Sequence, residues 1–416
     1  MGIENICNLQ NCTGCAACKQ ICTHEAISMQ LDEEGFLRPL INQDRCVECR
    51  ICIKICPVNT QTIKYEPIKV FSGWSNNEET RLTSSSGGAF VEIAKLILAQ
   101  NGVVFGVSMD SNMLAHHIFI ESEKEIYKLQ GSKYIQSIIG NAYKDAKQFL
   151  QEGRKVLFSG TPCQIAGLRN FLHKDYENLY TVDLICHGVP SPKVFKDYIH
   201  YIENAINEPV KEVKFRCKKS SWIFYNMGIN PHVEKKGSTK YSYIGNYYSD
   251  PYIRVFLRDN ILRPNCYQCQ YASLKRVGDF TIGDWWGYKA TTEKDKDFDR
   301  KGVSLLFCNT EKAVAVSLRL NMYLKERTKK EALHTNLPLK QPFPMPKTRD
   351  EFWSEYRTKT FIDMVKRWMV PERITLSKYC RIYHRNNTLL YRFFSLYERI
   401  VKKIGLNKFV IYKYAK

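Results

Sequence analysis

CTGCAACKQIC (residues 12–22) and CVECRICIKICP (residues 46–57) repeat one arrangement of four cysteines, and this repeat decides the fold of the N-terminal region. In each stretch, two residues separate the first three cysteines, and the fourth follows after three more. Nine of the sixteen cysteines lie before residue 57. Spacings this short suit ligands of one metal centre better than disulfides between distant strands. Thiolate ligands also imply a reducing compartment.

The spacing is the one that bacterial ferredoxins use for [4Fe–4S] clusters, in which the fourth cysteine of each run binds the other cluster. Zinc sites are the alternative, but they usually combine two Cys pairs across a longer spacer. We therefore predict two crossed sets of cluster ligands. The first cysteine set is Cys12, Cys15, Cys18 and Cys56, and the second cysteine set is Cys22, Cys46, Cys49 and Cys52. Cys7 lies outside the pattern and is interpreted as a bystander.

The chain as a whole has the composition of a water-soluble protein with two or three domains. It has 416 residues, of which 44% are hydrophobic and 25% are charged. The sequence contains no uncharged apolar run long enough for a transmembrane helix. Its N-terminus lacks the basic and apolar regions of a signal peptide. We expect a cytoplasmic protein.

Downstream of the cysteine repeat, the chain alternates between short apolar runs and helical patterns. The predicted elements are a helix over 89–100, strands over 103–109 and 117–121, a helix over 141–151, a strand over 155–160, a helix over 164–172, a strand over 179–186 and a helix over 192–206. This alternation favours βαβ units and a largely parallel sheet. The expected fold class is α/β, or α+β overall, with a small ferredoxin-like module, a flavin-binding body on a mixed or parallel sheet, and a helical basic C-terminal segment. The expected domains are residues 1–66, the two halves of the body at 67–150 and 151–320, and the extension at 321–416.

Several motifs in the body resemble the family of coenzyme F420 hydrogenase/dehydrogenase beta subunits. They are FSGTPCQIAGLRNFL (158–172), LICHGVPSP (184–192), CYQCQ (266–270) and GDFTIGDWWG (278–287), with SSSGGAF (84–90) and LQGSKYIQS (129–137) upstream. The resemblance covers about residues 1–310. It implies a flavin, usually FAD, that exchanges hydride with a diffusible substrate. The best-known substrate is coenzyme F420, but relatives reduce a chlorophyll derivative or occur among enzymes of polysaccharide synthesis.

Four further cysteines form a candidate third cluster site, which we name the third cysteine set: Cys163, Cys186, Cys266 and Cys269. Cys163 and Cys186 each follow a predicted buried strand, and the carboxyl ends of strands are where open α/β sheets place ligands. The alternative is that Cys163 and Cys186 are small core residues. The family resemblance favours the third [4Fe–4S] cluster.

A loop of small residues precedes the predicted helix at 89–100: Ser84, Ser85, Ser86, Gly87 and Gly88. Amide groups at such a helix N-terminus suit a pyrophosphate, although serine and glycine also simply cap helices. With the resemblance, the loop is expected to bind the flavin. Lys133 could place a cation near the flavin phosphate or ring, and a solvated surface lysine is the alternative.

Two residues are candidates for catalysis. His187 follows Cys186 and could move a proton to the reduced flavin, since histidine titrates near neutrality, or it could cap the following turn. Asp284 stands at a predicted strand end beside Trp285 and Trp286. Its carboxylate either touches substrate or caps a turn, and the tryptophans pack against a cofactor edge or the core.

The C-terminal segment is strongly basic. Residues 366–416 contain thirteen Lys or Arg and two Glu, within a chain of net charge +20. An amphipathic helix on an anionic membrane surface, a docking face for an acidic partner, and a plain solvated helix are the three interpretations. Nucleic acid is not expected as a partner, because no recognition motif accompanies the charge.

These observations predict an iron–sulfur flavoprotein oxidoreductase. A small-molecule hydride donor or acceptor would exchange electrons with FAD, and [4Fe–4S] clusters would connect the flavin to a redox partner protein or ferredoxin. One alternative is an electron carrier that serves a separate catalytic protein. Another is a reductase in glycan biosynthesis. The sequence does not identify the substrate or the direction of electron flow.

Overall fold

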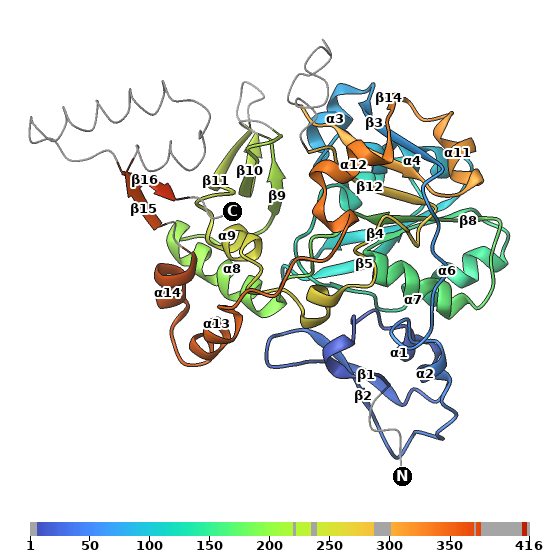
Figure 1. Ribbon diagram of the computed structural model, residues 1–416, viewed down its shortest axis with the longest axis horizontal. Coiled ribbons are helices and arrows are strands. Elements are labelled where there is room, and N and C mark those ends of the chain that lie inside the picture. The colour runs from blue at the N-terminus through green and yellow to red at the C-terminus, as the bar shows by residue number, and fades with distance from the viewer. Residues whose placement is uncertain are drawn as a thin grey trace, which may run out of the picture.

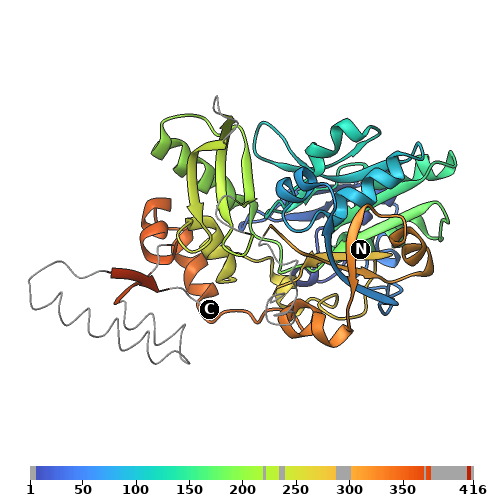
Figure 2. The same cartoon turned by 90° about the horizontal axis from the view of Figure 1, so that it is seen from above.

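The computed structural model describes residues 6–218, 222–233, 239–286, 301–369, 372–375 and 410–413. Figures 1 and 2 show a small N-terminal module, a body built on one large sheet, and a lobe beside the body that contains a second sheet. None of the described helices combines the length and the apolar character that crossing a membrane requires.

The N-terminal module is a two-stranded hairpin with short helices. Its elements are η1 (Leu9–Asn11), α1 (Ala17–Ile21), β1 (Ile27–Leu31), β2 (Leu37–Ile41) and α2 (Ile51–Lys54). Strands β1 and β2 are antiparallel, and α1 and α2 each begin inside one cysteine repeat. The module lies against α6 (Ala142–Gln151) and α7 (Pro162–Leu172) of the body, at the bottom of Figure 1.

The body is a nine-stranded sheet in the order β14-β3-β13-β12-β8-β7-β4-β5-β6. The strands are β3 (Lys69–Ser75), β4 (Val103–Met109), β5 (Ala115–Ile120), β6 (Ser137–Ile138), β7 (Val156–Gly160), β8 (Leu179–Leu184), β12 (Phe280–Asp284), β13 (Ser304–Cys308) and β14 (Met322–Glu326). The helices packed around it include α3 (Glu78–Thr83), α4 (Ala89–Leu98), α5 (Ile126–Leu129), α6 (Ala142–Gln151), α7 (Pro162–Leu172), α11 (Glu311–Ser317) and α12 (Lys329–Thr335). The predicted strands and helices of this region are thus confirmed to within a few residues.

The expected α/β fold class is confirmed, and of the two expected kinds of sheet the structure has the mixed one. The central β12, β8, β7 and β4 run parallel, as do β5 and β6. In contrast, β14, β3, β13 and β12 are antiparallel neighbours, and so are β4 and β5. The alternation of elements therefore overestimated parallel pairing. At the antiparallel edge, β3 pairs with β13 and β14, which lie more than 200 residues later in the chain. Local sequence patterns do not reveal such distant pairing.

The lobe combines a three-stranded antiparallel sheet with helices from two distant parts of the chain. Its strands are β9 (Val213–Cys217), β10 (Asn226–Val233) and β11 (Thr239–Asn246), and its helices are α8 (Pro192–Ile206), α9 (Pro251–Leu257), α13 (Arg349–Tyr356), α14 (Phe361–Met364) and η5 (Val365–Met369). Phe352, Trp353 and Trp368 pack into one apolar core with Phe195 and Tyr252. The start of the C-terminal segment is therefore part of the lobe.

The structure groups the C-terminal elements differently from the expected boundary at residue 321. Strand β14 lies beyond that boundary but belongs to the main sheet, and α13 lies in the core of the lobe. Of the basic segment 366–416, only residues 366–369 and the strands β15 (Glu372–Thr375) and β16 (Val410–Lys413) are described. The interpretations of that segment otherwise fall outside the described residues.

Candidate metal centres

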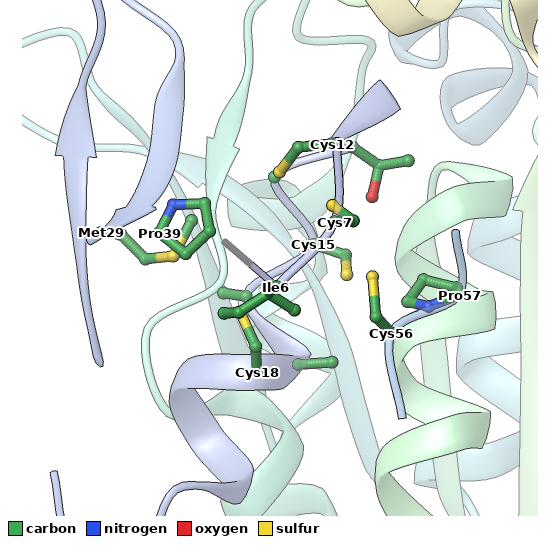
Figure 3. A pocket seen from close by; sticks show the side chains of 13 residues that line it. Ile6, Cys7, Cys12, Cys15, Cys18, Met29, Pro39, Cys56 and Pro57 are labelled. Carbon is green, nitrogen blue, oxygen red and sulfur yellow. The ribbon is translucent and has the colours of Figure 1, made fainter. Parts of the chain in front are cut away.

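The first cysteine set surrounds one cavity of about 320 Å³ in the module. Figure 3 shows Cys12, Cys15, Cys18 and Cys56 turned toward a common space. Cys56 comes from the second cysteine repeat, so residues of both repeats line this cavity, and the crossed ligand assignment stays a prediction. Cys7 lines the same cavity, which the sequence interpretation as a bystander did not anticipate.

The second cysteine set surrounds the other cavity of the module, of about 430 Å³. Its lining includes Cys22, Cys46, Cys49 and Cys52, together with apolar side chains such as Ile27 and Ile41. Cys49 is exposed, whereas all four members of the first set are buried. The second cavity is therefore the one nearer to solvent.

Equal spacing in the two repeats produces equal backbone turns. Gly14 and Glu48 both have positive φ, at 69° and 53°. Ala16 and Arg50, two residues further on, cap α1 and α2 in the left-handed conformation, with φ of 57° and 59°. Turns with left-handed residues direct successive backbone N–H groups to one side and form anion-binding concavities. Such concavities suit the sulfide and thiolate sulfurs of a cluster.

The chemistry of the buried thiols also fits metal ligation. Burial raises the pKa of the Cys15 thiol to about 12, so this side chain needs a strong positive charge to become a thiolate ligand. Within the described ranges, no three Cys, His, Asp or Glu side chains gather around the position of a single metal ion. In a cubane cluster each thiolate binds a different iron, so the four sulfurs need not converge on one point.

The third cysteine set is brought together from three loops of the body. Cys163 stands in the first turn of α7, Cys186 follows β8, and Cys266 and Cys269 lie within and just after η3 (Pro264–Gln268). Cys163, Cys266 and Cys269 each act electrostatically on Cys186, whose pKa burial keeps well above its ordinary value. The backbone N–H of Val189 donates to the Cys266 sulfur at 3.4 Å. The four predicted ligands are therefore neighbours.

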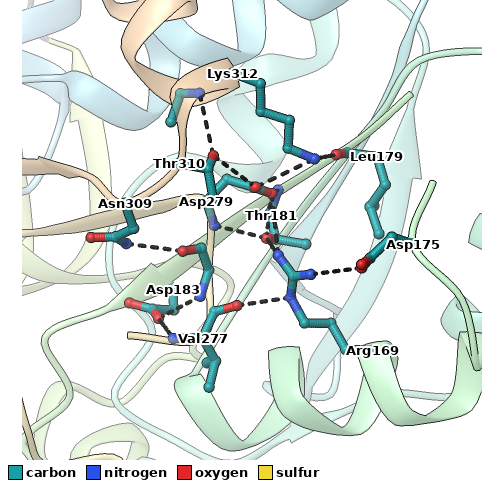
Figure 4. Close-up of polar contacts among 12 residues, drawn as sticks. Arg169, Asp175, Leu179, Thr181, Asp183, Val277, Asp279, Asn309, Thr310 and Lys312 are labelled. Carbon is teal, nitrogen blue, oxygen red and sulfur yellow. Dashed lines mark hydrogen bonds and ion pairs between the residues drawn. The ribbon is translucent and has the colours of Figure 1, made fainter. Parts of the chain in front are cut away.

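A buried ion pair holds the loop that carries Cys266 and Cys269. Arg276 Nη2 lies 2.8 Å from Asp183 Oδ1, and the two side chains are 1% and 0% exposed. Arg276 also donates to the carbonyl oxygens of Tyr271 and Ser273 at 3.0 and 3.1 Å. Figure 4 shows the neighbouring polar network, in which the Asp183 carboxylate accepts from the Val277 amide. The end of β8 thereby fixes the loop beside Cys186.

The first and third cysteine sets adjoin where the module meets the body. A Cβ atom on Gly167 of α7 would lie 3.0 Å from both Cβ and Sγ of Cys15. Tyr143, which is fully buried, is influenced electrostatically by Cys15, Cys163 and Cys18. Its backbone N–H donates to Gln20 Oε1 of the module at 2.9 Å. Glycine at position 167 thus permits the close approach of the two sets.

The two predicted flavin-binding segments lie side by side. Ser85 Oγ accepts hydrogen bonds from the backbone N–H and the hydroxyl of Ser132, at 2.7 and 2.9 Å. Part of the small-residue loop is already occupied, because Ser304 Oγ accepts from the amides of Gly87 and Ala89 at 2.9 and 3.5 Å. The loop amides are therefore only partly available to a pyrophosphate.

Lys133 differs from an ordinary solvated lysine. Its ammonium group donates to the carbonyl oxygens of Gln130 and Lys128 at 2.9 and 3.4 Å. Burial lowers the pKa of Lys133 to about 7. A bound phosphate would favour its charged form, because an opposite charge close by opposes the effect of burial.

The two predicted catalytic residues each have polar partners of their own. Arg216 Nη1 lies 2.8 Å from Asp284 Oδ2, and Trp222 Nε1 donates to Asp284 Oδ1 at 2.7 Å. Trp286 stacks on Trp222 with ring centroids 5.3 Å apart. Asp284 therefore orients the Arg216 guanidinium group and the stacked rings of Trp222 and Trp286. The sequence left open a contact with substrate or the capping of a turn, and this observed role is neither of the two.

His187 forms a 2.6 Å hydrogen bond from its Nε2 atom to Asp259 Oδ1. Its ring lies 4.8 Å from that of Phe256, which in turn stacks on Tyr134 at 5.1 Å. Tyr134 follows Lys133, and its hydroxyl accepts from Arg216 at 3.2 Å. An aromatic row thus connects the Lys133 segment with the residue next to Cys186.

Sequence reasoning missed residues whose partners are distant along the chain. Arg216 donates to Asp284, and Ser304 accepts from an amide of the Ser84–Gly88 loop. Neither Arg216 nor Ser304 belongs to a recognised motif. For Cys7 the sequence did offer a signal of its place near the first cavity, since it lies only five residues before the first repeat.

Comparisons with known proteins match most of the chain. The family model for the C terminus of the coenzyme F420 hydrogenase/dehydrogenase beta subunit matches residues 153–329, and the model for its N-terminal part matches residues 70–143. A 4Fe-4S dicluster domain model matches residues 11–60.

Individual relatives are distant. A protein of Methanosarcina mazei that is one of the subunits of F(420)H(2) dehydrogenase is 20% identical over 266 residues, which are 59% of this chain and 73% of that protein. Ferredoxin-type protein NapF of Haemophilus influenzae is 39% identical over 49 residues, which are 12% of this chain and 28% of that protein. A chain of the F420-reducing [NiFe] hydrogenase complex from Methanosarcina barkeri aligns with a TM-score of 0.41 and 15% identity, covering 63% of this chain and 82% of that chain. That score is too low to support an argument.

Proposed function

The chain belongs to the family of coenzyme F420 hydrogenase/dehydrogenase beta subunits and is an iron–sulfur electron-transfer oxidoreductase, and we propose that it binds FAD and three [4Fe–4S] clusters. In this proposal a hydride donor or acceptor, such as coenzyme F420 or another small molecule, reacts at the flavin. The electrons are exchanged with a redox partner protein at the module. Thiolate ligands need a reducing compartment, and we place the protein in the cytoplasm on that ground.

The close approach of Cys15 to α7, the helix that carries Cys163, is the observation that carries this proposal. The close approach of Cys15 to Gly167 brings the module's buried cavity against the cysteines of the body. The second set belongs to the same module and includes the exposed Cys49. Each cubane exchanges one electron at a time, so neighbouring sites are the arrangement that such chemistry needs.

The Ser84–Gly88 loop and the Lys133 segment, which are joined by the hydrogen bonds between Ser85 and Ser132, would together hold the flavin. A flavin supplies the junction between two-electron and one-electron chemistry. The loop serine hydroxyls and the remaining amides would bind the pyrophosphate, and Lys133 would contribute a charge. His187, held by Asp259, would move a proton between solvent and the region beside Cys186. Asp284 would keep Arg216 and Trp222 in place.

Cofactor content of the anaerobically purified full chain tests the proposal. We expect roughly twelve irons and one flavin per chain, from three cubanes. Cys163→Ala is expected to leave roughly eight irons, because only the third site is affected. Cys217→Ser is the matched control, since Cys217 belongs to no set and its sulfur donates to the Tyr241 hydroxyl at 3.2 Å. A chain that takes up no flavin on reconstitution contradicts the flavin assignment.

A second candidate is an electron carrier without a substrate of its own. It is favoured by the Methanosarcina mazei relative, whose name describes one component of a larger dehydrogenase. Reduction of artificial acceptors separates the two candidates. If reduced deazaflavin, NAD(P)H and reduced ferredoxin all fail to deliver electrons until a second protein is added, the carrier assignment is correct.

A further inference from the structure

Two arginines converge on the backbone carbonyl oxygen of Cys12, a member of the first cysteine set. Arg263 Nε donates to it at 2.7 Å, and Arg38 Nη1 donates to it at 3.1 Å. Arg263 Nη2 also donates to the Leu37 carbonyl at 2.9 Å and lies 3.6 Å from Cys12 Sγ. Arg263 belongs to the body, so its guanidinium group reaches across the boundary into the module.

The charges of these two arginines are balanced differently. Arg38 forms an ion pair with Asp32 at 2.9 Å. Arg263 is 1% exposed, and no carboxylate among the described residues forms an ion pair with it. Its buried Nη1 atom has no hydrogen-bond acceptor within the part of the chain that the structure describes. Burial lowers the pKa of Arg263, and among the groups that oppose this shift Cys12 and Cys266 act most strongly.

A buried guanidinium group without a counter-charge is strongly unfavourable, and the group keeps its proton. Cys12 belongs to the first cysteine set and Cys266 to the third. A cubane with four thiolate ligands is anionic, and reduction adds one more negative charge to it. The partner that Arg263 lacks among the side chains is therefore supplied when both sets hold their clusters.

We propose that Arg263 is the shared counter-cation of the first and third cysteine sets and raises the reduction potentials of the clusters that they hold. The proposal rests on the proposed function, because it requires clusters in both sets. A fixed positive charge stabilises the reduced form more than the oxidised form, so net charge nearby shifts the potential. Arg263 thereby raises the reduction potentials of the clusters in the first and third sets together, and it leaves the potential of the second set unchanged.

The packing around Gly14 supports this role. Gly14 has φ of 69°, and a Cβ atom there would lie 2.5 Å from Gln136 Nε2 and 2.8 Å from Arg263 Nη1. The absence of a side chain at position 14 thus lets the guanidinium group rest directly on the cysteine loop. Gln136 is buried beside it and accepts from the Leu37 amide at 3.0 Å.

The test is anaerobic film voltammetry of the full chain, with iron content measured on each sample. Two variants remove the effect of the charge: Arg263→Gln deletes it, and Gln136→Glu places a carboxylate beside it without emptying the site. Each is expected to lower two of the three cluster reduction waves by about tenfold in the reduction equilibrium, or about 59 mV for one electron. The third wave, from the second set, stays in place. Arg263→Lys is expected to retain most of the wild-type potentials.

Arg38→Gln is the matched control, because Arg38 donates to the same carbonyl but its charge is already balanced by Asp32. It is expected to shift the waves clearly less than Arg263→Gln. The proposal is overturned if both charge-removing variants keep their iron and leave all waves in place, or if all three waves move equally. A wild-type chain without iron instead refutes the proposed function.

Discussion

Replacing Asp183 with asparagine is expected to release the third cysteine set while leaving the other two intact. The Asp183 carboxylate is 0% exposed and pairs with Arg276 at 2.8 Å. It also accepts from the amides of Val277 and Gly278, at 3.1 and 2.9 Å. Asp183→Asn keeps the shape of the side chain but removes its charge, so Arg276 remains buried and unpaired.

The expected cost is about 3–5 kcal/mol in the free energy of unfolding, the usual result of removing one partner from a buried ion pair. This is a large share of the roughly 5–15 kcal/mol that stabilises a typical domain. Because Arg276 holds the loop through the Tyr271 and Ser273 carbonyls, the strain falls first on Cys266 and Cys269. Iron content should therefore fall from roughly twelve to roughly eight per chain.

Chemical unfolding and iron analysis of anaerobic samples check this prediction. Asp175→Asn is the control, since Asp175 is 79% exposed and lies 3.5 Å from Arg169. That exposed pair is expected to contribute under about 1 kcal/mol. The reasoning is refuted if the free energy of unfolding of Asp183→Asn lies within about 1 kcal/mol of the wild-type value and the variant keeps all its iron. Loss of iron from the module instead of the body would refute it as well.

Three further predictions concern the module boundary, the crossed ligands and the flavin region. Gly167→Ala is expected to lower the free energy of unfolding by about 1–3 kcal/mol and to weaken the contact between module and body, because its methyl group would lie 3.0 Å from Cys15 Sγ. Unchanged thermal stability would contradict this prediction. Cys56→Ala should abolish a reduction wave that Arg263→Gln shifts, whereas Cys22→Ala should abolish the wave that does not shift; the reverse result would show uncrossed ligands. Burial lowers the pKa of Lys133 from 10.5 to about 7, so the folded chain binds fewer protons than the unfolded chain between pH 7 and 10.5. Stability should therefore rise with pH in that window, by at most about 1.4 kcal/mol per unit, and Lys133→Met should remove this rise in denaturant titrations.

The sequence was most informative where the structure is determined locally. The helix at 89–100 and the strand at 103–109 were predicted nearly as observed, because each has a clear apolar pattern and small or polar residues at its ends. The two cysteine cavities also follow from local spacing, since left-handed turns at Ala16 and Arg50 give both repeats the same backbone conformation.

The remainder depended on contacts between distant segments. Strand β14 completes the antiparallel edge of the sheet by pairing with β3, which lies more than 200 residues earlier, so its place could not be predicted from periodicity. Arg263 has no motif around it that points to Cys12, which lies 251 residues away. Asp284 was singled out for its place at a strand end, but its partners Arg216 and Trp222 become evident only in three dimensions.

Electron paramagnetic resonance of the fully reduced chain tests most directly whether module and body form one electron-transfer unit. The contact between Cys15 and Gly167 predicts magnetic interaction between reduced clusters of the first and third sets, seen as broadened or split signals that simplify in Cys163→Ala. A spectrum that equals the sum of independent clusters, unchanged by that variant, would contradict the account.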